Sequence, residues 1–169
     1  MRDKIEVNGR SYSWPNVPLV VVCIDGSEPD YIEQAVENGL MPFTEEILSK
    51  GADLRVDSVI PSFTNPNNLS IVTGRPPAVH GISGNFFYDN SSDQEVMMND
   101  PSFLRAPTIF SAFEQAGARI AVITAKDKLR KLLGHGLTFG KGSSICFSAE
   151  KANEISLKDN GYEDILEIT

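Results

Sequence analysis

One stretch of the chain combines a hydroxyl nucleophile with a helix start. Thr64 is followed by Asn65 and Pro66, and then by an apolar-spaced run that stops at Gly74. Proline is tolerated in the first turn of a helix, so this pattern predicts a short helix that begins at Thr64. The unpaired N–H groups and the positive dipole end of that helix would stabilise a phosphate-like anion. A threonine that only caps the helix is the alternative interpretation.

Two other residues have side chains suited to the same chemistry. Asp25 ends the apolar, β-branched run 18–25, which predicts a strand buried on both faces. Ligands of open parallel sheets bind outside the carboxyl ends of the strands, so Asp25 is a candidate metal ligand. Asn85 ends the motif H-G-I-S-G-N. The alternatives are a turn-capping carboxylate at Asp25 and a turn residue at Asn85.

The elements around these residues alternate between strand and helix patterns. The sequence predicts strands at residues 18–25, 52–60, 119–124 and 144–148, and helices at residues 29–38, 42–50, 107–117, 150–155 and 162–168. Residues 84–101 predict a loop with a short hairpin around residues 96–98. The alternation predicts an α/β fold with a mainly parallel sheet flanked by helices.

The net charge, the apolar runs and the cysteines of the chain exclude some classes of protein. The net charge of −8 over 169 residues argues against general nucleic-acid binding. No apolar run approaches the length of a membrane span, and the first residues lack the apolar core of a secretory signal. Cys23 and Cys146 lie in apolar runs without a nearby cysteine, so we expect both to be small buried hydrophobes in a cytoplasmic protein.

A basic cluster interrupts the acidic chain. Lys126, Lys128, Arg130 and Lys131 place four positive charges within six residues. The first two follow the predicted strand 119–124 at its carboxyl end, where a carboxylate-bearing substrate could meet them. Residues two apart on a helix point to different faces, so both lysines reach one ligand only from a loop or a first helical turn. For Arg130 and Lys131 we favour a solvated helix end.

The motifs V-V-V-C-I-D-G and P-S-F-T-N-P-N-N-L-S-I-V-T-G-R-P-P-A-V-H-G-I-S-G-N closely resemble the alkaline phosphatase superfamily, in its nucleotide pyrophosphatase and phosphodiesterase branch. Within that branch the chain resembles the phosphonoacetate hydrolases. The resemblance covers residues 18–133 and implies that residues 1–169 form the N-terminal part of a single alkaline-phosphatase-like catalytic domain.

The resemblance implies an enzyme with two zinc ions. Asp25 would ligate one zinc, and Thr64 would bind it and attack phosphorus to form a phospho-threonine. A threonine hydroxyl is a poor nucleophile until a metal or a base activates it. Asn85 would donate a hydrogen bond to a non-bridging phosphoryl oxygen. Lys126 and Lys128 would bind the carboxylate of a small phosphonate, which is cleaved to acetate and phosphate.

The two histidines do not match the zinc ligands that the resemblance implies. We interpret His80 as structural, holding its loop through its two ring nitrogens, and leave His135 unassigned. The metal set is therefore incomplete, as in a segment of a longer polypeptide or a truncated product. We expect residues 1–169 alone to bind zinc weakly, to lack turnover, and to expose apolar surface that favours a homo-oligomer.

Two alternative functions remain open. A nucleotide pyrophosphatase or phosphodiesterase would need an apolar slot for a base, for which Phe86, Phe87 and Tyr88 are available; these aromatics could equally be core or loop anchors. A non-catalytic anion-binding fragment is the other alternative, because fold does not fix function. Mixed aspartate, threonine and histidine ligation would suit zinc, or iron and manganese in relatives.

Overall fold

The structure, a computed structural model, describes residues 4–152 and 155–164. It divides into two compact units. One comprises residues 1–16 and 59–169, and the other comprises residues 17–58. Among the helices in the described part of the chain, none has the length and apolarity needed to cross a membrane.

The smaller unit, residues 17–58, contains two helices that contact each other, α1 (Pro29–Glu37) and α2 (Pro42–Lys50). Each begins at a proline, whose fixed φ suits the first helical position. The chain leaves α1 through Gly39, which has a φ of 68°, and leaves α2 at Gly51. Both predicted helices are confirmed.

The predicted strands 18–25 and 52–60 are wrong. Neither segment forms a strand, and their apolar side chains are exposed, for example 81% at Val20 and 87% at Val56. A β-branched run favours the extended backbone, but a strand also needs a neighbouring chain to pair its N–H and C=O groups. The smaller unit contains no strand among its described residues.

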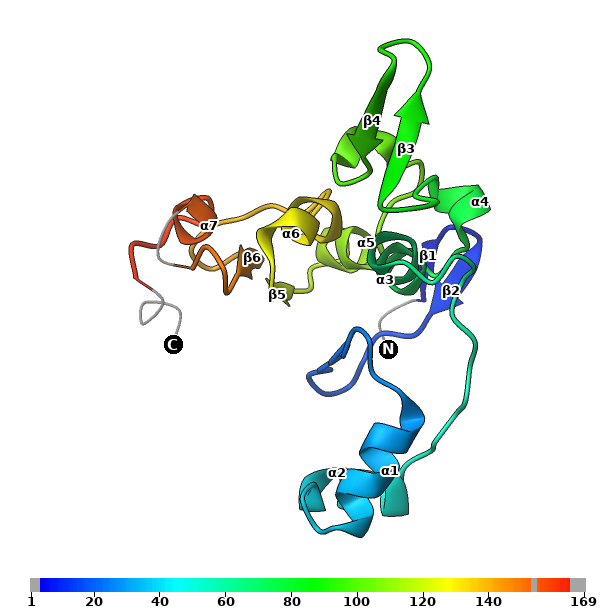
Figure 1. The fold of residues 1–169 in the computed structure, drawn as a ribbon. Helices are drawn as coiled ribbons and strands as arrows, with labels where there is room; N and C mark the ends of the chain where they lie inside the picture. The colour runs from blue at the N-terminus through cyan, green and yellow to red at the C-terminus, as the bar shows by residue number, and fades with distance from the viewer. Residues whose placement is uncertain (1–3, 153–154, 165–169) are drawn as a thin grey trace. The chain divides into compact units, whose positions relative to one another are not determined.

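The larger unit is organised around helix α3 (Thr64–Thr73), which ends at Gly74 with a φ of 64°. This helix contacts α4 (Pro77–His80), α5 (Ile109–Gln115) and α6 (Asp127–Leu133). Figure 1 shows α3 and α5 beside the N-terminal hairpin. The buried core consists of Leu69, Val72, Ile82, Met98, Val122, Leu132, Leu133 and Cys146. The predicted helices that begin at Thr64 and span residues 107–117 are therefore confirmed apart from their ends.

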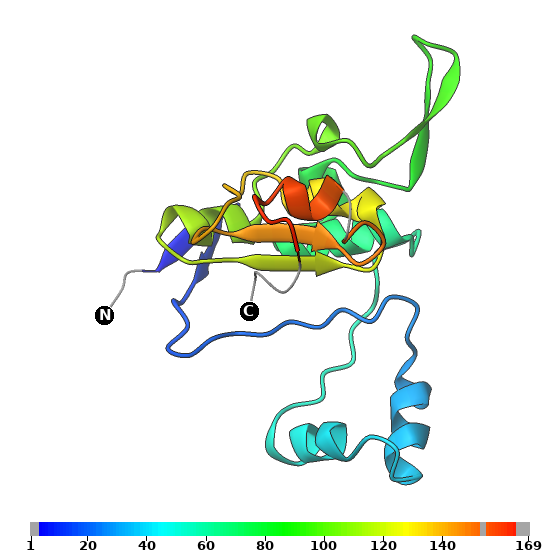
Figure 2. The same ribbon diagram turned by 90° about the vertical axis from the view of Figure 1, so that its left-hand side faces the viewer.

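The parallel sheet is confirmed at one pair of strands, β5 (Ala121–Thr124) and β6 (Ile145–Ser148). Figure 2 shows these two strands side by side and pointing the same way. Helix α6 contacts both strands, and α7 (Ile155–Lys158) contacts β6. The predicted helix 150–155 is displaced to α7. Of the predicted helix 162–168, residues 162–164 are not helical and the remainder lies outside the described residues.

The other two sheets of the described chain are antiparallel hairpins, so a mainly parallel sheet is not what the structure contains. Strands β3 (Phe86–Asp89) and β4 (Gln94–Met97) form a hairpin within residues 84–101, followed by the short 3-10 helix Pro101–Phe103. A hairpin was expected in this segment, but its turn lies at residues 90–93 and not around residues 96–98.

Strands β1 (Ile5–Val7) and β2 (Arg10–Tyr12) form an N-terminal hairpin that our sequence analysis missed. Its turn residues Asn8 and Gly9 have φ values of 53° and 69°. Positive φ at both positions fits the type I′ turn that Asn-Gly favours, so this dipeptide was the available signal. The carboxamide nitrogen Nδ2 of Asn8 donates to the carbonyl of Thr73, at 2.9 Å, and to that of Pro107, at 2.8 Å. The hairpin thus holds the end of α3.

We predict that Asn8→Gly lowers the free energy of unfolding by about 1–3 kcal/mol, because glycine keeps the positive φ but removes both hydrogen bonds. Urea unfolding measures the change. Asp93→Gly is the matched control, since Asp93 also has a positive φ, of 56°, in an exposed hairpin turn. Equal effects of the two substitutions would show that the Asn8 bonds do not stabilise α3.

Candidate active site

The structure brings Asn85 to the start of α3. Thr64 is the first residue of the helix and is half-buried, and the preceding Phe63 is extended with a ψ of 156°. The side-chain oxygen Oδ1 of Asn85 accepts a hydrogen bond from the backbone N–H of Asn65, 20 residues earlier, at 3.1 Å. Two of the predicted site residues, Thr64 and Asn85, therefore lie on segments that are directly bonded to each other.

Asn65 completes a small network between three segments. Its Nδ2 donates to the carbonyl of Met98 at 2.9 Å, and the N–H of Met98 donates to the carbonyl of Asn85 at 2.8 Å. Asn85 is thus held through both its backbone and its side-chain oxygen. The Asn65 N–H is already paired, so it is not one of the open helix amides that the sequence led us to expect for an anion.

The loop after α3 is held by His80, which is fully buried. Its Nδ1 accepts from the N–H of Ile82 at 3.2 Å, and its Nε2 lies 3.0 Å from Oγ of Ser70, which donates to the carbonyl of Pro66 at 2.8 Å. Because Nδ1 accepts, the neutral ring carries its proton on Nε2. The structural role predicted for His80 is confirmed.

The structure shows why the motif H-G-I-S-G-N has a glycine at position 81. Its φ is 87°, and a Cβ there would lie 2.8 Å from the carbonyl oxygen of Phe103. Any side chain would be strained and would push the loop away from the segment that follows β4. The N–H of Arg105 donates to the carbonyl of His80 at 3.0 Å, which closes this contact from the other side.

The two predicted substrate lysines lie at the start of α6. Lys126 is its N-cap and Lys128 lies in its first turn, and both are exposed. They follow β5 at its carboxyl end, where Thr124 Oγ1 donates to the carbonyl of Lys126 at 2.9 Å. This is the placement from which two lysines of this spacing can reach one ligand.

The solvated role predicted for Arg130 is wrong, whereas Lys131 is exposed as expected. Arg130 is 5% exposed and forms ion pairs with Asp127, at 2.7 Å, and with Asp159, at 3.1 Å. Burial raises the pKa of Asp127, but hydrogen bonds from Arg130 and Ser148 and the charge of Arg130 outweigh it and hold that pKa below its usual range. The pair fixes the first turn of α6 between the two lysines.

Asp25 lies in an exposed turn before α1, in the smaller unit. Residues 18–24, which lead into it, form no strand, so its predicted place at a strand end is not observed. Within the described residues, no group of three or more His, Cys, Asp or Glu is arranged to hold a metal ion. These residues do not form a metal site by themselves.

The two cysteines differ in solvent exposure. Cys23 is exposed, contrary to our expectation, because the run that contains it is not part of a sheet. Cys146, on β6, is 1% exposed, and burial raises its pKa to about 12. Only Cys146 is the small buried hydrophobe that the sequence predicts.

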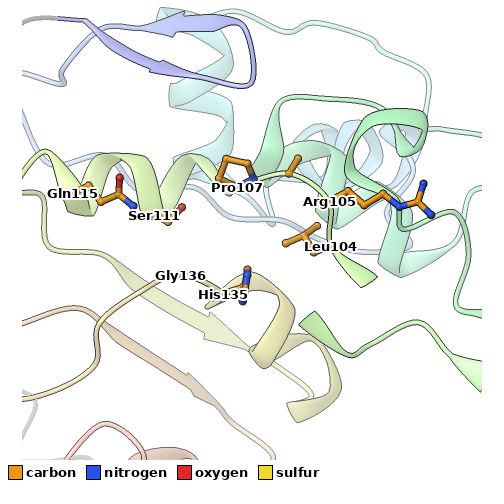
Figure 3. Close-up of a pocket in the computed structure, with 8 residues that line it drawn as sticks. Leu104, Arg105, Pro107, Ser111, Gln115, His135 and Gly136 are labelled. Atoms are coloured by element: carbon orange, nitrogen blue, oxygen red, sulfur yellow. The ribbon is translucent and has the colours of Figure 1, made fainter. Parts of the chain in front are cut away.

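A shallow pocket of about 320 Å³ lies elsewhere, between α5 and the loop that follows α6. Figure 3 shows His135 and Ser111 in its wall, with the guanidinium of Arg105 directed away from them. None of the predicted site residues lines this pocket. One of its lining residues, Arg105, donates its backbone N–H to the carbonyl of His80 in the loop described above.

Comparison with known proteins identifies the family. The sequence profile of the type I phosphodiesterase / nucleotide pyrophosphatase family matches residues 19–135, which include the Asn85 loop, α3 and the lysine pair. The chain belongs to this family. An ectonucleotide pyrophosphatase/phosphodiesterase of Caenorhabditis elegans is 30% identical over 119 residues, which cover 66% of this chain and 15% of that protein.

Among solved structures, this chain is similar to the phosphonoacetate hydrolase of Sinorhizobium meliloti 1021 in complex with phosphonoformate. The identity is 56% and the TM-score 0.92. The same enzyme in complex with phosphonoacetate gives the same values. The match covers 99% of this chain and 41% of the hydrolase, so the chain spans about two fifths of that enzyme. The α/β fold and the resemblance to the phosphonoacetate hydrolases are confirmed.

Sequence analysis missed Asn65 as a contributor to the site. It appeared only as a residue between Thr64 and Pro66, and nothing in its type or spacing indicates that its side chain is 2% exposed and tied to Met98. The ion pair between Arg130 and Asp159 was missed because Asp159 lies in a distant segment, whereas the other partner, Asp127, is three residues away on the same helix.

Burial lowers the pKa of His80, and a hydrogen bond with the Pro66 carbonyl only partly opposes this shift. The unfolded chain then takes up a proton near pH 6.5 while the folded chain stays neutral, so stability decreases as the pH falls below 6.5. We predict a slope of at most about 1.4 kcal/mol per pH unit in urea unfolding between pH 7 and 5.5.

His80→Asn should remove that part of the slope, because asparagine keeps an acceptor for the Ile82 N–H without titrating. His135→Asn, at an exposed histidine, is the control for the loss of an imidazole. A slope that persists in His80→Asn would assign the pH dependence to other groups.

Proposed function

We propose that the protein hydrolyses the carbon–phosphorus bond of phosphonoacetate to acetate and phosphate. The observation that supports this proposal is the hydrogen bond from the Asn65 N–H to Oδ1 of Asn85, which joins the Asn85 loop to the helix start that bears Thr64. The 56% identity to a phosphonoacetate hydrolase over 99% of the chain supports this choice of substrate. Residues 1–169 would then form the N-terminal part of one alkaline-phosphatase-like catalytic domain.

In the proposed reaction, Oγ of Thr64 attacks phosphorus as the carbon–phosphorus bond breaks. The electron pair of that bond moves to the methylene carbon, where the adjacent carboxylate delocalises it. The Thr64 hydroxyl loses one proton and the methylene carbon gains one, which gives acetate. Water then cleaves the phospho-threonine and releases phosphate. Asn85 would donate through Nδ2 to a non-bridging phosphoryl oxygen, because its Oδ1 is occupied by the Asn65 N–H.

We further propose zinc as the cofactor, with two ions in the complete site and with Asp25 and Thr64 as ligands from this chain. Carboxylate and hydroxyl oxygens are suitable donors for zinc. Since the described residues contain no complete donor set, the remaining ligands would come from the rest of the protein, and activity would require them.

Lys126 and Lys128 would bind the substrate carboxylate. Both ammonium groups are exposed, and they flank an aspartate whose charge is paired with Arg130. That pairing leaves the first turn of α6 with two positive charges facing solvent. A small dianionic or trianionic phosphonate fits such a surface better than a neutral ester does.

A nucleotide pyrophosphatase or phosphodiesterase is the second candidate, favoured by the names of the curated relatives, which are 30–34% identical. The hairpin gives this candidate less support. Phe87 packs edge-on against Phe103 with ring centroids 5.2 Å apart, and the hydroxyl of Tyr88 is bonded to Asp93. Phe86 and the ring of Tyr88, which are 55% and 54% exposed, remain to contact a base.

We predict that Thr64→Ala lowers phosphate release from phosphonoacetate by about 10³-fold or more, since the nucleophile is lost. Thr64→Ser should retain measurable activity through its hydroxyl. Phosphate and acetate release by the zinc-loaded full-length protein measure both effects, and mass spectrometry of quenched turnover should find phosphate on residue 64. Unchanged activity of Thr64→Ala would refute the proposed nucleophile.

We predict that Lys126→Ala raises the KM for phosphonoacetate about tenfold or more, equivalent to about 1.4 kcal/mol of binding. The KM for a neutral-tailed nitrophenyl phosphodiester should change little, because that substrate has no carboxylate. Lys131→Ala, at an exposed lysine beyond the first turn of α6, is the matched control. Equal effects of Lys126→Ala on both substrates would exclude the lysine from carboxylate recognition.

A further inference from the structure

Asn65 is a polar residue in an unusual environment. Its side chain is 2% exposed, and while Nδ2 donates to the Met98 carbonyl, Oδ1 has no hydrogen-bond partner among the described residues. A buried carbonyl oxygen without a donor is unfavourable, by an amount comparable to a lost hydrogen bond. An apolar side chain would avoid this cost, so packing alone does not explain an asparagine here.

The backbone at Asn65 is also constrained. It lies in the first turn of α3 and directly precedes Pro66, and a residue before proline is disfavoured in the helical conformation by clash with the ring. The Nδ2 bond to Met98 ties the side chain of Asn65 to the segment after β4. This hydrogen bond to Met98, called the tether below, therefore opposes rotation of the Phe63–Asn65 backbone that directs the Asn65 N–H toward Asn85.

The three bonds form a closed path. Asn65 N–H holds Oδ1 of Asn85, Met98 N–H holds the carbonyl of Asn85, and Nδ2 of Asn65 holds the carbonyl of Met98. With Oδ1 fixed in this way, the carboxamide of Asn85 has one orientation, and Nδ2 is the group left to donate. No hydrogen bond of that Nδ2 occurs within the part of the chain that the structure describes.

We infer that Asn65 is a positioning residue: its buried carboxamide aims Nδ2 of Asn85 at the phosphoryl group that Thr64 attacks. The inference rests on one part of the proposed function, that Thr64 and Asn85 act on phosphorus. It does not depend on which phosphorus compound is the substrate. Asn65 does not touch the substrate. It acts through Asn85, so its loss slows the chemical step and leaves substrate binding largely intact.

The test uses the zinc-loaded full-length protein with Asn65→Leu and Asn65→Ala. Leucine matches the branched shape of asparagine and removes only the tether, whereas alanine also leaves a cavity. We expect both to lower kcat about 10- to 100-fold with KM changed by less than about threefold, below the 10²- to 10³-fold typical of losing an oxyanion donor outright. Circular dichroism and the Tm establish that each variant is folded.

Asn160→Ala is the matched control. Asn160 is also fully buried, and it bonds the N–H and carbonyl of Cys146 on β6. Its substitution should lower the Tm at least as much as Asn65→Leu does and leave kcat unchanged. A loss of kcat in Asn160→Ala that tracks its Tm would assign the Asn65 effect to general destabilisation and overturn the inference.

A double-mutant cycle gives the sharper result. If Asn65 acts through Asn85, Asn65→Leu should lower kcat in the wild type but by less than about threefold in an Asn85→Ala background. Additive effects overturn the inference, as does an unchanged kcat in Asn65→Leu alone.

The proposed function fails separately, if the wild type releases no phosphate from phosphonoacetate. The double-mutant cycle is then measured with the nitrophenyl phosphodiester. That substrate also has a phosphoryl group for Nδ2 of Asn85, so it tests the inference equally well. A wild type inactive on both substrates overturns both proposals.

Discussion

The hydrogen bond between the Asn65 N–H and Oδ1 of Asn85 is the interaction on which the candidate site depends. It joins the first turn of α3 to a loop 20 residues further along the chain. Neither residue could hold the other without support, because one hydrogen bond contributes little net stability. The surrounding structure supplies that support: Met98 bonds both asparagines, while His80 connects the same loop through Ser70 to Pro66 within the first turn of α3.

Helix α3 is held equally well at its other end. Asn8 donates to the last helical carbonyl, and a side chain at Gly74 would be strained by its positive φ and would displace the Tyr12 hydroxyl. Between the two ends, Leu69 and Val72 are buried in the core formed with α6 and the β5–β6 pair. A residue on a helix that is fixed at both ends and along one face has little freedom to move. Thr64 therefore occupies a position suited to chemistry that needs close geometric control.

Ion pairs in the larger unit separate one buried cation from the exposed lysines near it. Arg130 is buried with Asp127 and Asp159, so the basic cluster of the sequence divides into one structural cation and three exposed lysines. In the smaller unit, apolar residues such as Val20 and Val56 remain exposed, as expected for strand-like sequences without a strand to pair with.

The sequence by itself determined the local structure of this protein: prolines set the starts of α1 and α2, glycines set the ends of α1, α2 and α3, and Asn-Gly sets the first hairpin. It also indicated the family and the structural role of His80. These features follow from allowed φ and ψ values and from short motifs, which residue types largely fix. Tertiary structure alone decided that Asn65 is tied to Met98, that Arg130 is buried, and that the run 18–25 is not a strand. Each of these depends on which distant segment supplies a partner, and the local sequence does not encode that partner.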